Sequence, residues 1–179
     1  MKYNIEQFQH DSNPQKFLFF WGHQPEKDGS IGKGCLSQWW PCTFEVDGME
    51  YRSAEHWMMA QKASLFGDIE IFQQICAANS APEAKKLGRM VRNYQDDIWI
   101  AHRYEIVKTG NWHKFSQNEA LKAYLLQTKQ RVLVEASPVD AIWGIGMAAD
   151  HPSIHIPSSW LGLNLLGFAL MEVRDLLSL

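Results

Sequence analysis

The pattern of apolar and polar residues predicts short strands in the first third of the chain. Residues 17–21 form a compact apolar run, FLFFW, which is typical of a buried strand, and the turn-rich stretch HQPEKDGSIGKG after it predicts a loop. Residues 43–46 and 49–51 alternate and flank Asp47-Gly48. Because Asp-Gly favours the positive φ angles of a tight turn, these residues predict a β-hairpin.

Helical patterns follow the hairpin. Ser53 has a side chain suited to an N-cap and predicts a helix that stops at Gly67. Asp68 predicts the cap of a second helix through IEIFQQICAA. Two Ser-x-x-Glu motifs, starting at Ser80 and Ser116, predict further helix starts, because the cap and the third residue after it satisfy each other's backbone donors.

The second half of the chain predicts a long helix, two strands and a final helix. Apolar residues recur from Asp96 to Thr109, ahead of Gly110. Residues 131–135 predict a strand, residues 141–143 a second one, and residues 161–177 a last helix. This order of elements predicts an α+β fold, a mostly helical single domain over residues 1–179 packed around a small β-sheet.

Composition excludes several classes of protein. The 179 residues suit one domain, and 46% hydrophobic with 21% charged residues is typical of a globular chain. No apolar run approaches the roughly 18 residues of a membrane span. The net charge of -3 provides no overall positive field for polyphosphate, which disfavours a dedicated duplex-binding protein. The segment MKYNIEQFQHD lacks the apolar core of a secretory signal, so we expect a cytoplasmic protein.

Metal and cofactor motifs are not found in the sequence. The three cysteines form no C-x-x-C pair, which argues against a disulfide framework and a cysteine zinc site and favours reduced thiols. His151 and His155 have a chelating spacing only on a helix, and the prolines around them predict a loop, so we expect no metal. Neither G-x-G-x-x-G after a strand nor G-x-x-x-x-G-K-[ST] is present, and we expect no cofactor.

The segment YRSAEHWMMAQKAS carries the most informative pair of charged residues. Seven residues separate Glu55 from Lys62, which at about 100° per residue returns to within roughly 20° of the same helical direction. The carboxylate and the ammonium therefore share one face. The alternative is structural, because Glu in the first turn and Lys in the last turn also complement the helix dipole.

Two further segments carry candidate residues. In SPVDAIWGIG, Asp140 precedes Trp143 and Gly144, where glycine permits a tight turn and lets a ligand approach the backbone. An ordinary turn with a capping Asp is the alternative. Trp99, in DDIWIAHRYEIV, is either a core residue or an aromatic surface for a base or a sugar.

The sequence resembles the NADAR, or YbiA-like, family from about Phe17 to the C-terminus. The resemblance rests on CLSQWWPCTFEVDGMEYRSAEHWMMAQKA, DAIWGIG and NLLGFALMEVR, which follow the family pattern in order. Two departures are visible. Gln38 and Trp39 stand where the family more often has Asn and Phe, which affects substrate contacts there, and the loop over residues 147–163 is long.

The resemblance implies a helical α+β fold and N-glycosidase chemistry on ribosyl compounds. Family activities include hydrolysis of phosphorylated ribosylamino-pyrimidine intermediates of riboflavin synthesis and removal of ADP-ribose from modified guanine. It implies three catalytic residues, Glu55, Lys62 and Asp140. The residues implied in substrate binding are Trp99, Trp143, Gly144, Asn164, Arg174 and Gln38.

This chemistry suits the residue types. Cleaving an N-glycosidic bond builds positive charge on the anomeric carbon, which a carboxylate stabilises, while a second carboxyl group protonates the leaving group or activates water. Glu55 and Asp140 are candidates for either task. Lys62 either binds phosphate as an ammonium or, as a neutral amine, forms a Schiff base with the sugar. Apolar neighbours such as Trp57 and Met59 would lower its pKa and adjacent carboxylates would raise it.

The expected partner is a small molecule, a ribosyl phosphate or an ADP-ribosyl compound. Nucleic acid enters only as a modified substrate, and no membrane partner is expected. The alternative from another functional class is a non-catalytic module that binds ADP-ribose or a related nucleotide. The presence of both acids and the lysine argues against it. The sequence does not predict an oligomeric state.

Overall fold

The computed structural model describes residues 1–10 and 15–179, and its chain divides into two units. The first unit comprises Met1–Ser37 and Ala123–Leu179, and the second comprises Gln38–Lys122. The second unit is thus one continuous stretch between the two segments of the first. Helix α6 (Glu119–Gln127) carries the chain from the second unit back into the first.

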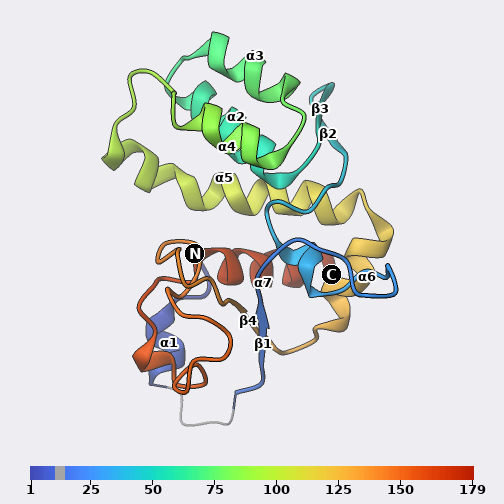
Figure 1. The fold of residues 1–179 in the computed structure, drawn as a ribbon, viewed down its shortest axis with the longest axis vertical. Coiled ribbons are helices and arrows are strands. Elements are labelled where there is room, and N and C mark those ends of the chain that lie inside the picture. Colours follow the sequence, from blue (N-terminus) through green and yellow to red (C-terminus); the bar gives the residue numbers. More distant parts are fainter. Residues whose placement is uncertain (11–14) are drawn as a thin grey trace. The chain divides into compact units, whose positions relative to one another are not determined.

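The first unit is built on a parallel pair of strands. Strand β1 (Phe17–Phe20) pairs with β4 (Val132–Glu135), with Phe17 opposite Val132. Helix α7 (Leu165–Leu177) packs against β4, as Figure 1 shows, and ten consecutive residues of α7, from Leu165 to Arg174, are buried. The remaining elements of this unit are α1 (Ile5–Gln9), η1 (Lys33–Leu36) and η2 (Pro157–Ser159).

Gly167 in α7 and Asn164 at its N-cap explain how the helix approaches β4 so closely. A Cβ atom at Gly167 would lie 2.1 Å from the carbonyl oxygen of Leu133, so only glycine fits there. Asn164, the N-cap of α7, has a left-handed backbone with φ of 53°. Its side-chain amide accepts a hydrogen bond from the Glu135 N–H and donates one to the Leu133 carbonyl.

The N-terminal segment packs along α7. The ring of Phe8 stacks on Phe168 of α7, with centroids 5.5 Å apart. The Tyr3 hydroxyl donates a hydrogen bond of 2.8 Å to the Asp175 carboxylate, which also pairs with Lys2. The segment therefore covers part of α7 that would otherwise contact water.

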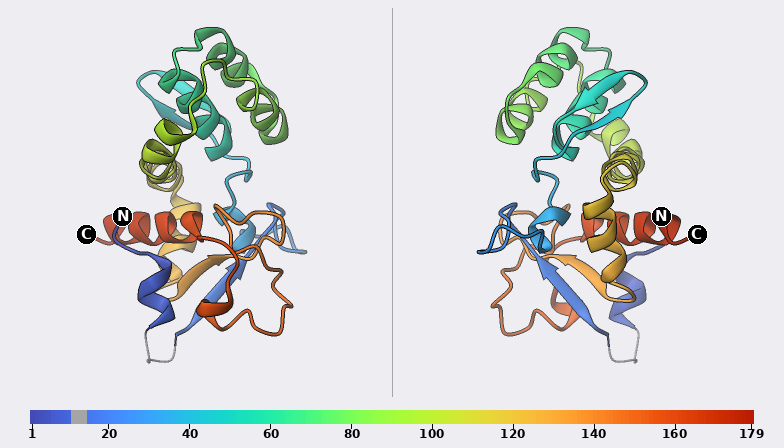
Figure 2. Two further views of the ribbon diagram at one scale, coloured as in Figure 1. Left: turned by 90° about the vertical axis from the view of Figure 1, so that its left-hand side faces the viewer. Right: turned by 90° about the vertical axis from the view of Figure 1, so that its right-hand side faces the viewer.

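The second unit is a layer of helices with a small hairpin. The hairpin consists of β2 (Phe44–Val46) and β3 (Met49–Tyr51). Helix α2 (Ala54–Leu65) packs against α3 (Ile69–Ala77), α4 (Ala81–Gly88) and α5 (Asp96–Ser116), as both views of Figure 2 show. Because α2 is surrounded on several sides, even its polar residues Glu55 and His56 are buried.

The predicted turn and most of the predicted helix caps are confirmed. Asp47 and Gly48 have φ angles of 52° and 77°, as the hairpin turn requires. The side chains of Ser53, Asp68 and Ser80 each accept a hydrogen bond from the backbone of the helix that follows. The strands predicted at residues 17–21 and 131–135 are β1 and β4, and the mostly helical α+β fold is confirmed.

The prediction of a helix start at Ser116 is wrong. Ser116 is the last residue of α5, and α6 begins three residues later at Glu119, where the carbonyl of Asn118 accepts the Lys122 N–H. Helix α5 also continues past Gly110. A Cβ atom there would lie 2.2 Å from Cδ1 of Trp57, so this glycine marks close packing against α2 rather than a helix end.

Two predictions near the C-terminus are also corrected. Residues 141–143 form a turn rather than a strand, because the Asp140 carboxylate binds the backbone there. The last helix begins at Leu165, not at residue 161, because residues 161 and 163 donate their N–H groups to the carbonyls of Ile145 and Ala141. No helix within residues 1–10 and 15–179 has the length and apolar character needed to cross a membrane.

Candidate active site

Glu55 lies in the first turn of α2, inside the second unit. Its side chain is buried, with 2% of the residue exposed. The Glu55 N–H donates a hydrogen bond of 2.9 Å to the carbonyl oxygen of Gln38, which ties the segment ahead of β2 to the start of α2. The Ser53 cap and this bond together satisfy backbone donors at the N-terminus of α2 and hold the turn that carries the carboxylate.

Lys62 lies two turns further along α2 and ends against two aromatic rings. Its Nζ donates a hydrogen bond of 2.9 Å to the carbonyl oxygen of Gly88, at the end of α4. The same atom lies 4.4 Å from the centroid of the Tyr94 ring and 5.8 Å from that of Trp99. Burial lowers the pKa of Lys62 below its ordinary value. The ammonium group of Lys62 therefore lies next to a backbone carbonyl and two aromatic rings.

The aromatic groups at Lys62 differ from those expected from the sequence. Trp57, a neighbour in sequence, directs its indole N–H to the carbonyl oxygen of Ile106 and packs its ring edge-to-face with Tyr51. The rings next to the ammonium are those of Trp99, a candidate from the sequence that is buried with 8% exposed, and Tyr94, which the sequence does not single out. Tyr94 lies in a short polar loop segment, RNYQ, directly ahead of α5, that has no periodic pattern, so the sequence carried no signal for it.

The loop that carries Tyr94 is fixed by an ion pair. The carboxylate of Asp68, the N-cap of α3, accepts hydrogen bonds from the Arg92 backbone N–H at 2.9 Å and from its Nε at 3.0 Å. The Tyr94 hydroxyl donates to Asp96 at 2.7 Å, and its ring packs edge-to-face on Phe66. These contacts hold the Tyr94 ring over Lys62. Arg92 also holds the pKa of the Asp68 carboxyl well below its usual range.

Gln38 is buried beside the first turn of α2, with 7% of the residue exposed. Its Oε1 accepts a hydrogen bond of 2.7 Å from Nδ2 of Asn111, on α5. Since the Gln38 carbonyl also binds the Glu55 N–H, this residue is linked to the candidate catalytic carboxylate through the backbone.

Asp140 belongs to the first unit and organises a turn. Its Oδ1 accepts hydrogen bonds of 2.8 Å from the N–H groups of both Ile142 and Trp143. Its other oxygen, Oδ2, accepts no hydrogen bond from the part of the chain that the structure describes. Asp140 is half-buried, and its Oδ1 orients the carboxylate through these two bonds.

Trp143 and Gly144 connect this turn to α7. Their carbonyl oxygens accept hydrogen bonds of 3.1 Å from the N–H groups of Leu166 and Asn164, respectively. A Cβ atom at Gly144 would lie 2.7 Å from the carbonyl oxygen of Glu135, so the glycine allows the turn to pack on the end of β4. The Trp143 side chain is half-buried.

The two residues from the final helix motif contact the framework of the first unit. Asn164 is fully buried, and both ends of its amide bind the backbone of β4. Arg174 is 5% exposed and donates from Nη1 to the Thr128 hydroxyl and the Arg131 carbonyl, each at 2.8 Å. These contacts join α7 to the β4 region, and a contact of either residue with substrate stays a prediction.

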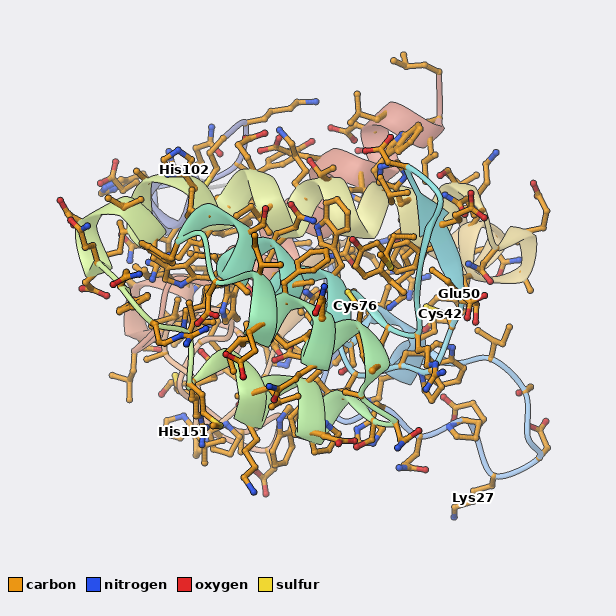
Figure 3. All side chains as sticks on the ribbon, turned by 90° about the horizontal axis from the view of Figure 1, so that it is seen from above. Lys27, Cys42, Glu50, Cys76, His102 and His151 are labelled. Atoms are coloured by element: carbon orange, nitrogen blue, oxygen red, sulfur yellow. The ribbon has the colours of Figure 1, made fainter. Side chains whose placement is uncertain are left out.

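Within residues 1–10 and 15–179, no group of three or more His, Cys, Asp and Glu side chains could hold a metal ion. His155 lies against the rings of Phe17 and Phe19. Cys42, just ahead of β2, and Cys76, on α3, are labelled in Figure 3. Burial raises the pKa of both thiols, which makes them weak nucleophiles at neutral pH.

Residues 19–178 match the model of the NADAR domain. The chain belongs to the NADAR domain family. Its Glu55, Lys62, Trp99 and Gln38 lie in the second unit, whereas Asp140 and Trp143 lie in the first. The NADAR match therefore runs across both units and includes every candidate residue described above.

Several NADAR-like proteins are named as N-glycosidases. N-glycosidase R617 of Acanthamoeba polyphaga mimivirus is 44% identical over 166 residues, covering 89% of this chain and 95% of that protein. N-glycosidase YbiA of Escherichia coli (strain K12) is 31% identical over 140 residues, covering 78% of each. The riboflavin biosynthesis protein VVA0006 of Vibrio vulnificus is 33% identical over 142 residues, covering 79% of this chain and 35% of that protein.

The NADAR fold is also found among solved structures. The NMR structure of the Escherichia coli protein YbiA superposes with a TM-score of 0.71 at 25% identity, covering 99% of this chain and 94% of that one. The mostly helical α+β architecture is therefore common to this chain and YbiA.

Proposed function

We propose that this NADAR domain hydrolyses the N-glycosidic bond of phosphorylated ribosylamino-pyrimidines, intermediates of riboflavin synthesis. The family makes the chain an N-glycosidase, a hydrolase acting on N-glycosyl compounds. The substrate is supported by the similarity to a riboflavin biosynthesis protein and by the net charge of -3, which suits a small molecule better than a nucleic acid.

The observation that carries the proposal is the environment of Lys62. Its Nζ is held by the Gly88 carbonyl next to the Tyr94 and Trp99 rings, and burial lowers its pKa. A lysine in such surroundings is a better nucleophile than an exposed one, because more of it is neutral at a given pH. Tyr94 is 40% exposed, so its ring offers a flat surface on which a base can stack, whereas Trp99 is buried behind the lysine.

The two carboxyl groups supply the remaining chemistry. Breaking the glycosidic bond leaves positive charge on the sugar C1 and an electron pair on the base nitrogen. The buried Glu55 is the candidate to stabilise C1 or activate water, and Asp140, with one oxygen available, is the candidate to donate a proton to the base. The same chemistry also allows the opposite assignment, in which Asp140 acts at C1 and Glu55 donates the proton.

Lys62 takes one of two roles in this reaction. As an amine it attacks C1, the base leaves with a proton, and opening of the sugar ring gives a Schiff base that water hydrolyses back to the amine. As an ammonium it binds the substrate phosphate. Borohydride added during turnover should trap a ribosyl adduct on the wild type. Neither Lys62→Ala nor the cationic control Lys62→Arg should form the adduct, and its absence from the wild type would leave only phosphate binding.

The substrate is tested by offering the protein two classes of compound. Incubation with a phosphorylated ribosylamino-pyrimidine should release ribose phosphate, which is measured by chromatography. Release of ADP-ribose from ADP-ribosylated guanine instead would favour the nucleic-acid substrate. If neither compound is cleaved and ADP-ribose binds equally well to wild type and Glu55→Gln, the domain is a binding module and the proposal is wrong.

A further inference from the structure

A pair of buried amides lies beside the first turn of α2. Gln38 is 7% exposed and Asn111, on α5, is fully buried. The Asn111 Nδ2 donates two hydrogen bonds, one of 2.7 Å to Gln38 Oε1 and one of 2.9 Å to the carbonyl oxygen of Val107, one turn earlier in α5. Both partners come from the second unit.

The Val107 carbonyl determines the direction of both amides. A carbonyl oxygen only accepts, so Asn111 must turn Nδ2 and not Oδ1 toward Val107. The second proton of Nδ2 then points to Gln38, where only Oε1 can accept it. Gln38 therefore has its Nε2 group on the side away from Asn111 Nδ2.

Gln38 Nε2 is a buried donor that the fold leaves unused. It makes no hydrogen bond with any residue in the described ranges, 1–10 and 15–179, although it is shielded from solvent. Buried amide donors are nearly always hydrogen-bonded, because leaving one unpaired destabilises the folded state. An unpaired donor of this kind therefore indicates a group that binds here during function.

The position and charge of the donor indicate what it binds. The Gln38 carbonyl accepts the Glu55 N–H at 2.9 Å, so the donor belongs to the segment that is bonded to the turn carrying Glu55. Gln38 itself is neutral, and the Glu55 carboxylate would repel a phosphate held close to it. A neutral acceptor, such as a carbonyl oxygen on a heterocyclic base, fits this position better.

We propose that Gln38 Nε2 donates a hydrogen bond to the ring carbonyl of the leaving base, and that Asn111 is the positioning residue that fixes this donor; the assignment rests on the N-glycosidase activity proposed above. When the C–N bond breaks, its electron pair stays on the base and spreads onto the conjugated carbonyl oxygen. The hydrogen bond is therefore stronger in the transition state than in the bound substrate, and it selects bases that carry this oxygen.

The sharpest test exchanges the donor for an acceptor without changing its shape. In Gln38→Glu, Oε1 still accepts from Asn111 while an oxygen replaces Nε2, and Gln38→Met removes the donor without adding charge. Each variant is assayed on a ribosylamino-pyrimidinone 5′-phosphate and on the matching ribosylamino-pyrimidine 5′-phosphate whose base lacks the carbonyl oxygen. For Gln38→Met we expect kcat/KM for the pyrimidinone to fall about tenfold to a hundredfold, mainly through kcat, and that for the pyrimidine without the carbonyl to change little. Gln38→Glu also adds a negative charge near Glu55, so it should slow both substrates, and the pyrimidinone more.

Asn111→Leu tests the positioning role. Without Nδ2 the Gln38 amide loses the hydrogen bond that sets its orientation, so we expect a smaller loss that is again confined to the pyrimidinone. Asn118→Leu is the matched control, because Asn118 also donates to a carbonyl one turn earlier in α5, that of Lys114, but has no bond to Gln38. It should lower thermal stability without distinguishing the two substrates.

The outcomes separate this proposal from the function it rests on. A wild type that cleaves neither ribosyl compound overturns both. A wild type that cleaves them equally fast, or Gln38 variants that slow both substrates by the same factor, overturns the proposal about the base and leaves the N-glycosidase activity standing. If Asn111→Leu does not fold, the two Gln38 variants still decide the donor's role.

Discussion

At the scale of single residues, the two oxygens of Asp140 differ in their hydrogen bonds, and we propose that they differ in function. Oδ1 is used by the N–H groups of Ile142 and Trp143, whereas Oδ2 binds no described residue. The first oxygen fixes the turn, and under the proposed function the second exchanges a proton with the substrate. A variant that changes the charge but keeps the carbonyl oxygen separates the two functions.

Asp140→Asn should therefore fold normally and lose activity. The asparagine oxygen still accepts both backbone N–H groups, but its amide cannot transfer a proton, so we expect kcat to fall by a factor of about 10² or more. Asp140→Ala should lose activity and also unfold at a lower temperature, because both N–H groups lose their acceptor. Steady-state kinetics and thermal unfolding measure the two effects. Wild-type turnover by Asp140→Asn would restrict this residue to shaping the turn.

The sequence predicts some residues of the site better than others. Helical spacing singles out Glu55 and Lys62 as a pair, and both lie on one continuous helix, whereas their catalytic role rests on the family resemblance. Tyr94 and Asn111 do not, since their roles depend on contacts with residues that are distant in sequence, such as Lys62 and Gln38. The family motif around Asn164 implied a contact with substrate, and the contacts that the structure shows there are with the backbone of β4.

At the scale of elements, the pairing of Asp68 with Arg92 connects the start of α3 to the loop before α5. Asp68 caps α3 and at the same time binds the backbone and side chain of Arg92. The cap was visible in the sequence, because Asp follows Gly67 directly before an apolar helical run. The ion pair was not, because Arg92 lies 24 residues away in a loop.

This pair should make stability depend on acidity. The pKa of Asp68 is lowered in the folded state, so the folded protein binds this proton less readily than the unfolded chain. Its stabilisation is present above the unfolded pKa, near 4, and is lost as the pH falls toward the lowered folded pKa. Asp68→Asn keeps a capping oxygen but lacks the charge. Thermal unfolding at pH 7 and pH 3 should show a smaller acid-induced loss in Asp68→Asn than in the wild type, and equal losses would contradict the assignment.

The elements that were predicted wrongly share a physical cause. Ser116 and Glu119 satisfy a capping pattern, but α5 continues to Ser116 because Gly110 packs under Trp57 instead of ending the helix. The residues after 160 have helical spacing, but their N–H groups bind the turn at 141–145. In both places a contact between distant segments overrides a local preference, and local pattern alone does not contain that information.

At the scale of the whole molecule, the N-terminal segment lies outside the matched NADAR domain, which begins at residue 19. It nevertheless contributes to the first unit, because Phe8 stacks on Phe168 and Tyr3 binds Asp175. The segment therefore supports α7.

Phe8→Ala should lower stability and leave the chemistry intact. Loss of the half-buried ring stacked on Phe168 should reduce the free energy of unfolding by about 1–2 kcal/mol. Trp21→Ala is the control, because Trp21 is an aromatic residue of the same unit that is mostly exposed and should change stability little. Denaturant unfolding gives both values. A large fall in kcat for Phe8→Ala at full folding would assign the segment to the site instead.

The parallel pairing of β1 with β4 has a consequence for how this protein can be altered. The chain leaves the first unit once, after residue 37, and rejoins it once, at residue 123, so residues 38–122 form one continuous insertion. Exchanging this insertion between related proteins would transfer Lys62 and its aromatic neighbours together, while both strands of the recipient keep their register. The base preference of such chimeras would show which of the two units determines it.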